Sequence, residues 1–158
     1  MNALTSLWHR VTGILSGTIV ESIVLFITRI ALAGIFWRSY KTKIEEGTWF
    51  TANDFQQVLF ENEFSGLPLP TDIAIPLTIY AEFLFPVLLV IGLASRFSAA
   101  ALAVMALVIQ IFIFPTSAHF FGWVISVLAL ALIIISRGPG LISLDAAVGR
   151  FIGKPASA

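Results

Sequence analysis

The sequence predicts an all-α integral membrane protein, a four-helix bundle with amphipathic surface helices at both termini and in the outer loop. Two observations lead to this prediction. Of the 158 residues 58% are hydrophobic and only 11% are charged, which is more apolar than soluble domains usually are. The apolar residues also gather into segments near the ~20 residues that a helix needs to cross ~30 Å of hydrocarbon. We expect one domain over residues 1–158.

The four predicted spans follow one another with short connections between the last three. They run over residues 18–37, 73–93, 97–114 and 120–135. Residues 94–96 and 115–119 are too few for anything but antiparallel helical hairpins. The second, third and fourth spans are therefore expected to be neighbours in space.

Three weaker segments are predicted to lie on the membrane surface. Residues 4–15 and 144–151 each carry apolar side chains at helical spacing, which is typical of helices that rest on the headgroups. The connection over residues 38–72 is long and contains a short amphipathic stretch. A simple amphipathic connector is favoured there over a lid that closes the outer mouth of the bundle.

The distribution of basic residues predicts how the bundle sits in the membrane. With four spans, both termini share one side with the turn between the second and third spans. That side carries Arg10, Arg96, Arg137, Arg150 and Lys154, and the other carries Arg38, Lys41 and Lys43 beside six acidic residues. The positive-inside bias therefore places both termini in the cytoplasm and the protein in the inner (plasma) membrane. A cleavable signal peptide is disfavoured because Glu21 and Arg29 interrupt its apolar region.

Composition argues against several classes of function. A net charge of zero leaves no basic surface for nucleic acid. The absence of cysteine removes dithiol chemistry and iron–sulfur ligation. His9 and His119 fall on opposite sides of the membrane, so they do not jointly hold a haem or a metal. No catalytic constellation is visible, and whether the protein is an enzyme stays open.

Arg29 and Glu82 are predicted to form an ion pair inside the membrane. Each would cost ~2.5–3.5 kcal/mol if it were unpaired in a span. Counted from residues 37 and 73 at ~1.5 Å per residue, both lie ~12–14 Å inside the membrane. Opposite charges at equal depth predict a guanidinium–carboxylate contact. That contact either fixes helix register alone or belongs to a polar pocket.

A polar pocket is expected in the outer half of the bundle, around Arg29 and Glu82. Four other side chains are candidates to donate hydrogen bonds there: Gln110, Tyr80, His119 and Arg38. An apolar slot between helices with a few placed polar groups suits the tail and headgroup of a quinone. Quinone is therefore the one cofactor that the pattern suggests, and any redox centre would belong to a partner protein.

Three stretches of the chain also carry a family resemblance. Residues 29–43 read RIALAGIFWRSYKTK, Ala81-Glu82 precede PVLLVIGLASR at residues 86–96, and residues 138–145 read GPGLISLD. In order and spacing, over roughly residues 20–148, they resemble the DoxX family of small four-helix membrane proteins. The positions that look like family hallmarks are Arg29, Glu82, Arg96 and the closing GPGxxSLD.

The resemblance implies a role in membrane redox or stress chemistry, but it does not identify a substrate. The family is named for its likeness to the membrane part of an archaeal thiosulfate:quinone oxidoreductase. Some members join assemblies concerned with oxidative stress, and versions with a similar FWRS segment look like those of proteobacterial clusters for copper stress. We expect a quinone-interacting or membrane-anchoring subunit with a membrane or soluble redox partner. The alternative is a non-catalytic scaffold or accessory protein of a copper stress system, and self-association is left open.

Overall fold

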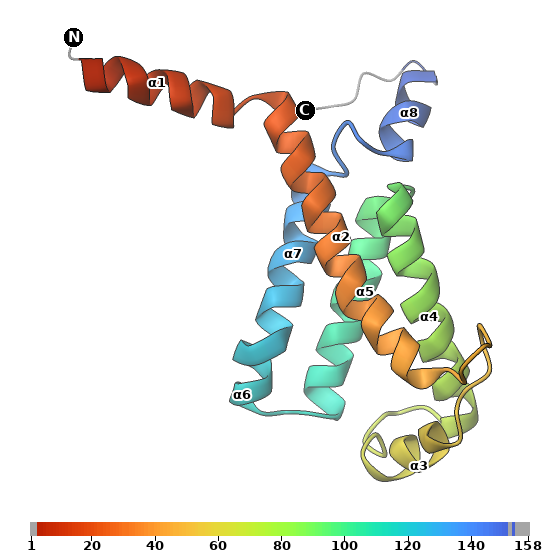
Figure 1. Cartoon of the computed structure of the whole chain (residues 1–158). Coiled ribbons are helices and arrows are strands. Elements are labelled where there is room, and N and C mark those ends of the chain that lie inside the picture. The colour runs from red at the N-terminus through yellow and green to blue at the C-terminus, as the bar shows by residue number, and fades with distance from the viewer. Residues whose placement is uncertain (1–2, 152, 154–158) are drawn as a thin grey trace.

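The computed structural model describes residues 3–151 and 153, and its regular elements there are all helical (Figure 1). The predicted all-α class is confirmed. Lys154, counted above among the basic residues, lies outside the described residues. The elements in chain order are α1 (Ala3–Leu15), α2 (Thr18–Lys43), α3 (Phe55–Asn62), α4 (Thr71–Ile91), α5 (Ser95–Phe112), α6 (Ser117–His119), the π-helical η1 (Phe120–Val124), α7 (Ile125–Arg137) and α8 (Leu144–Phe151).

Four helical runs are long and apolar enough to cross a membrane, which confirms the four predicted spans. They are α2, α4, α5 and the run Ser117–Arg137 that joins α6, η1 and α7. The first differs most from its prediction, because α2 continues six residues past residue 37 to Lys43. Its buried positions include Tyr40 and Lys43, so packing extends the helix beyond the purely apolar stretch.

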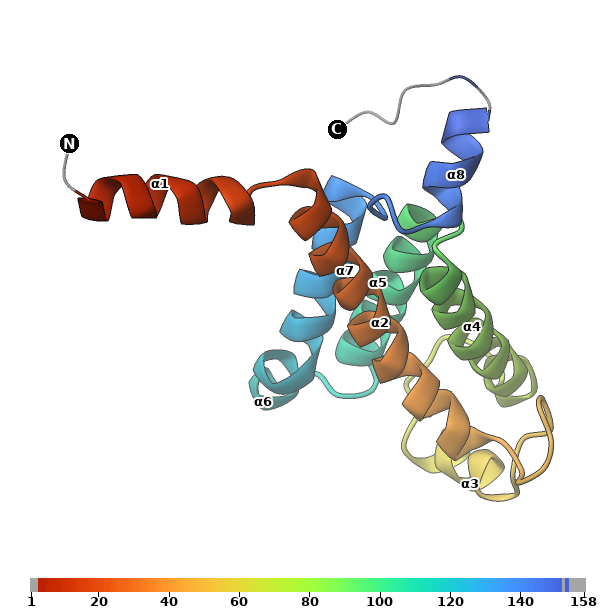
Figure 2. The ribbon, with the colours of Figure 1, turned by 45° about the horizontal axis from the view of Figure 1, so that its top comes forward.

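The bundle core lies where α2, α4, α5 and α7 meet. Helix α2 packs between α4 and α7, and α5 packs against both α4 and α7 (Figures 1 and 2). Ala99 and Ala106 on α5 are fully buried, which lets the α5 backbone approach its neighbours closely. The predicted adjacency of consecutive spans, α4 with α5 and α5 with the fourth span, is therefore confirmed.

The α3 end of the bundle has its own apolar cluster. Tyr40, Ile44, Phe60, Ile75 and Ile79 are buried there together, and they join the end of α2 to α3 and to the start of α4. The Tyr40 hydroxyl donates to the backbone oxygen of Trp49 at 2.5 Å, which ties the long connection to α2. This connection packs on the bundle as a cover, rather than running free as a simple connector.

The opposite end carries α1 and α8, at the far end of the bundle from α3 (Figure 1). Helix α1 projects sideways from the start of α2 (Figures 1 and 2). Its large apolar side chains are exposed: Leu4, Leu7, Trp8, Val11, Ile14 and Leu15. The expected amphipathic character of this terminal segment is thus present, and its apolar side is available to lipid.

The first turn of α8 lies against the start of α5. The two carboxylate oxygens of Asp145 accept from the backbone amides of Ala94 and Ser95 at 2.8 and 2.9 Å. Ala94 has a left-handed backbone, with φ of 49°, and the carboxylate holds it at the start of α5. An anion at a helix N-terminus also interacts favourably with the helix dipole.

Candidate ligand cavity at the α3 end

Arg29 and Glu82 do not pair, so the predicted ion pair is wrong. The Nη1 of Arg29 donates to the backbone oxygen of Leu89 at 2.9 Å, and its Nη2 donates to the backbone oxygen of Ile142. The predicted depth of Arg29 was counted from residue 37, but α2 ends at Lys43. Six extra residues at ~1.5 Å each move Arg29 ~9 Å toward the α8 end.

Glu82 pairs instead with Lys43, the last residue of α2. The Nζ of Lys43 lies 2.9 Å from Oε2 and 3.1 Å from Oε1 of Glu82. The Ser39 hydroxyl donates to Oε1 at 3.0 Å and accepts from Lys43 at 2.7 Å. Glu82 is 1% exposed and Lys43 8% exposed, so the pair is buried and each charge depends on the other.

Sequence reasoning missed Ser39 and placed Lys43 among the loop charges. A signal for Lys43 was present, because positions 29, 33, 36, 40 and 43 follow helical spacing. All five of these positions are buried on α2. Extending the stripe past residue 37 would have placed Lys43 on the face that meets α4.

A cavity of about 600 Å³ opens beside this pair, within the usual range of small-molecule sites. Its walls come mainly from α4 and α5, and Trp123 and His119 also line it. Most of the lining is apolar, and its polar side chains include Ser39, Lys43, Thr78, Glu82 and His119. Leu77 and Val104 on the rim are 55% and 59% exposed, so the cavity opens sideways, toward lipid.

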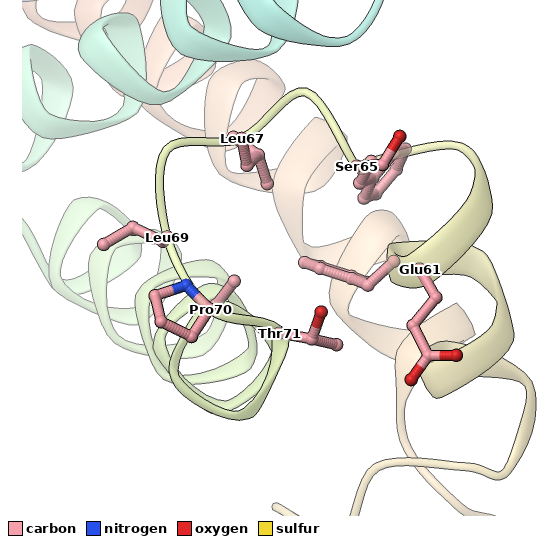
Figure 3. Close-up of a pocket in the computed structure, with 9 residues that line it drawn as sticks. Glu61, Ser65, Leu67, Leu69, Pro70 and Thr71 are labelled. Carbon is pink, nitrogen blue, oxygen red and sulfur yellow. The ribbon is translucent and has the colours of Figure 1, made fainter.

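The connection around α3 covers the end of the cavity. Phe60, Phe64 and Leu67 line the large cavity and also a smaller hollow of about 260 Å³ on the outer side. Figure 3 shows this hollow, with Glu61 of α3 on one side and Pro70 and Thr71, where the chain enters α4, on the other. Apolar side chains of this connection are therefore part of the cavity wall at the α3 end. The lid that was the less favoured alternative describes this arrangement better than a connector does.

His119 is held in the cavity wall by Gln110. Its Nδ1 lies 2.8 Å from Oε1 of Gln110, and the Nε2 of Gln110 donates to the backbone oxygen of Thr116 at 3.1 Å. The imidazole also lies between the rings of Phe114 and Trp123, at centroid distances of 5.0 and 5.4 Å. The π-helical η1 begins directly after His119, and such π turns are frequent at functional sites.

The predicted site residues therefore differ in whether they lie at the cavity or away from it. Glu82 and His119 line the cavity, and Gln110 supports His119. Tyr80 is 54% exposed and stacks on Phe50 outside the cavity. Arg38 is exposed and Arg29 lies toward the α8 end, and neither lines the cavity. Within residues 3–151 and 153 no cluster of three His, Cys, Asp or Glu side chains could hold a metal ion.

The sequence profile of the DoxX family matches residues 24–115, more than half of the chain. The chain belongs to the DoxX family. No curated protein and no solved structure matches it. The DoxX match covers most of α2, all of α3, α4 and α5, and with them Ser39, Lys43, Glu82 and Gln110. His119 and the GPGLISLD segment lie beyond its end. This DoxX-family chain is a multi-pass membrane protein with four candidate spans.

Proposed function

We propose that this DoxX-family protein binds a quinone and serves as the quinone-interacting membrane subunit of a redox complex. The observation that carries the proposal is the cavity beside Glu82 and Lys43, which is apolar along its length and polar at a buried charged cluster. A quinone has the same division, with a polar ring and an apolar tail.

The way into the cavity supports a ligand that is dissolved in the bilayer. The rim residues Leu77 and Val104 are exposed on the sides of α4 and α5, which face lipid in a four-span bundle. Phe60, Phe64 and Leu67 of the α3 connection contribute apolar side chains to the cavity wall at the α3 end. A lipid-soluble ring can enter sideways and reach Glu82 without crossing the aqueous phase, whereas a hydrophilic substrate has to pass the apolar cover.

The proposal includes an orientation and a partner. The basic residues at the α8 end favour cytoplasmic termini, which puts the cavity in the half of the inner membrane away from the cytoplasm. The chain itself has no cysteine for redox chemistry. Electrons would therefore pass between the quinone and a redox group of a partner protein.

A non-catalytic scaffold or accessory subunit, for example in a copper stress system, is the second candidate. It is favoured by α1, whose apolar side chains have little contact with the bundle and are exposed, as Leu4 at 79% and Trp8 at 67% illustrate. A helix of this kind anchors a protein on the membrane surface or docks a partner. The two candidates differ in one respect, because a scaffold does not require a ligand in the cavity.

Saturable quinone binding tests the proposal. Wild-type protein in lipid nanodiscs is titrated with a short-chain quinone, and quenching of tryptophan fluorescence is recorded, since Trp123 lines the cavity. We expect saturable quenching in wild-type protein. Glu82→Gln, which removes the carboxylate charge, should weaken binding of the reduced form of the same quinone by about tenfold, the loss of a charged hydrogen bond.

Two further variants control for damage to the fold. Ala101→Phe fills the cavity from α5 and leaves the Lys43–Glu82 pair intact, so it should also abolish saturable quenching. Tyr80→Phe alters an exposed residue outside the cavity and should bind like wild type. Quenching that never saturates in wild-type protein, or that is equal in wild type and Ala101→Phe, would refute the proposal.

A further inference from the structure

The orientation of the Gln110 side chain fixes the hydrogen-bonding state of His119. The amide nitrogen of Gln110 donates to the backbone oxygen of Thr116, an atom that can only accept. Turning the amide over would bring two acceptor oxygens together. The Oε1 of Gln110 is therefore the atom that faces His119, and it can only accept. It follows that Nδ1 of His119 carries the hydrogen.

The other ring nitrogen of His119 is then an acceptor. A neutral imidazole carries one N–H, so with Nδ1 protonated the Nε2 atom has a free lone pair. The described part of the chain gives Nε2 no hydrogen-bond partner. His119 lines the cavity, and Nε2 is its ring nitrogen that remains able to accept a hydrogen bond there.

The charged cluster offers an acceptor as well. The ammonium protons of Lys43 are shared among Ser39 and both carboxylate oxygens, and the Ser39 hydroxyl donates to Oε1 of Glu82. No proton of this cluster is left over for a ligand. Oε2 of Glu82 accepts only from Lys43 and keeps a free lone pair, because a carboxylate oxygen can accept twice.

The remaining polar groups of the wall suit a ligand in either redox state. The Thr78 hydroxyl can donate or accept, and the Trp123 indole donates to any oxygen. A quinone carbonyl and a hydroquinone hydroxyl both accept, but only the hydroxyl donates. Nε2 of His119 and Oε2 of Glu82 therefore discriminate between the two states, because each needs a donor.

We propose that the cavity selects the reduced ligand, a hydroquinone, over the quinone, through Nε2 of His119 and Oε2 of Glu82. This inference rests on the proposed function and adds a redox preference to it. A buried acceptor that faces a carbonyl oxygen is left unpaired and repelled, which penalises the oxidised form.

Matched titrations of the two redox forms test the preference. The same short-chain ligand is titrated by calorimetry as hydroquinone, under argon, and as quinone into nanodiscs at pH 8. We expect wild-type protein to bind the hydroquinone about tenfold more tightly. His119→Phe keeps the ring packing but has no Nε2, so it should lose most of that preference by weakening hydroquinone binding alone.

Gln110→Ala tests whether Gln110 acts through the hydrogen-bonding state of His119. If the role of Gln110 were purely structural, its replacement would not change the preference between the two redox forms. Without Oε1 the imidazole can carry its hydrogen on either nitrogen, so quinone binding should improve while hydroquinone binding falls. Tyr80→Phe should keep the wild-type preference. Equal binding of the two forms by wild-type protein would overturn the redox preference and leave the proposed function standing, whereas failure of both forms to bind would overturn the proposed function itself.

Discussion

Arg29 joins three parts of the chain through its guanidinium group. It reaches from α2 to the backbone oxygens of Leu89 on α4 and Ile142 in the segment after α7, and its charge interacts with Asp145. The side chain is fully buried and lies over the Phe26 ring, 5.4 Å from its centroid. This is a structural arrangement, because the fork of donors satisfies backbone oxygens on two segments.

Gly92 is the residue that makes room for this contact, and its replacement tests the arrangement. Its φ of +73° favours glycine, and a Cβ there would collide with the Arg29 guanidinium and come within 2.5 Å of Ser143 Cβ. Gly92→Ala should therefore destabilise the protein by about 1–3 kcal/mol or more. The measurement is the folded fraction during titration of the purified protein with sodium dodecyl sulfate.

Gly34→Ala is the matched control for this prediction. Gly34 lies in α2 with no atom near the position of a Cβ. Alanine there should leave stability unchanged or raise it by roughly 0.5–1 kcal/mol, since glycine is the poorer helix former. Similar losses of stability in Gly92→Ala and Gly34→Ala would show that the Arg29 contact contributes nothing specific.

At the scale of elements, hydropathy located the spans and misplaced the end of α2. The apolar stretch stops near residue 37, and the last turns of the helix carry Arg38, Lys41 and Lys43, so composition alone ends the span too early. Burial of Tyr40 and Lys43 against α4 and the α3 connection keeps these turns helical. The predicted partner of Glu82 was wrong for this reason, although Glu82 itself was chosen correctly as a buried charge.

The fourth span illustrates a feature that composition does not reveal. Its first turns are α6 and the π-helical η1, and only then does α7 begin. A π turn leaves no distinct mark in a stretch as apolar as residues 120–135. Gln110 and His119 were each predicted as site residues, but their mutual hydrogen bond depends on the short turn between α5 and α6, which had to be seen in three dimensions.

At the scale of the whole molecule, α1 and α8 lie at one end of the bundle and α3 at the other (Figure 1), and the connection around α3 lines part of the cavity. Which end of the bundle faces the cytoplasm can be measured by labelling single introduced cysteines, because the chain contains no cysteine of its own. With cytoplasmic termini, an impermeant maleimide should label Glu46→Cys, an exposed position near α3, in intact spheroplasts. It should label Ser136→Cys, at the α8 end, only after permeabilisation. The reverse pattern would contradict the proposed orientation.

The molecule also has a second apolar groove. Where a ligand binds therefore shows whether the polar residues of the cavity contribute to its recognition. This groove of about 360 Å³ lies between α2 and α4, beside Gly34 and Pro86, and its lining holds no ionisable residue. A lipid tail could occupy either groove through apolar contact alone. Only the cavity between α4 and α5 adds Glu82 and His119, so a quinone is expected there.

The most direct test of this account is to locate a photoreactive quinone on the protein. Nanodiscs are illuminated with an azido-quinone, and the modified peptides are identified by mass spectrometry. The account predicts labels on the cavity-facing parts of α4 and α5, near Ala81 and Met105, that an excess of unlabelled short-chain quinone removes. Labels confined to the groove beside Gly34, or labels that no competitor removes, would contradict it.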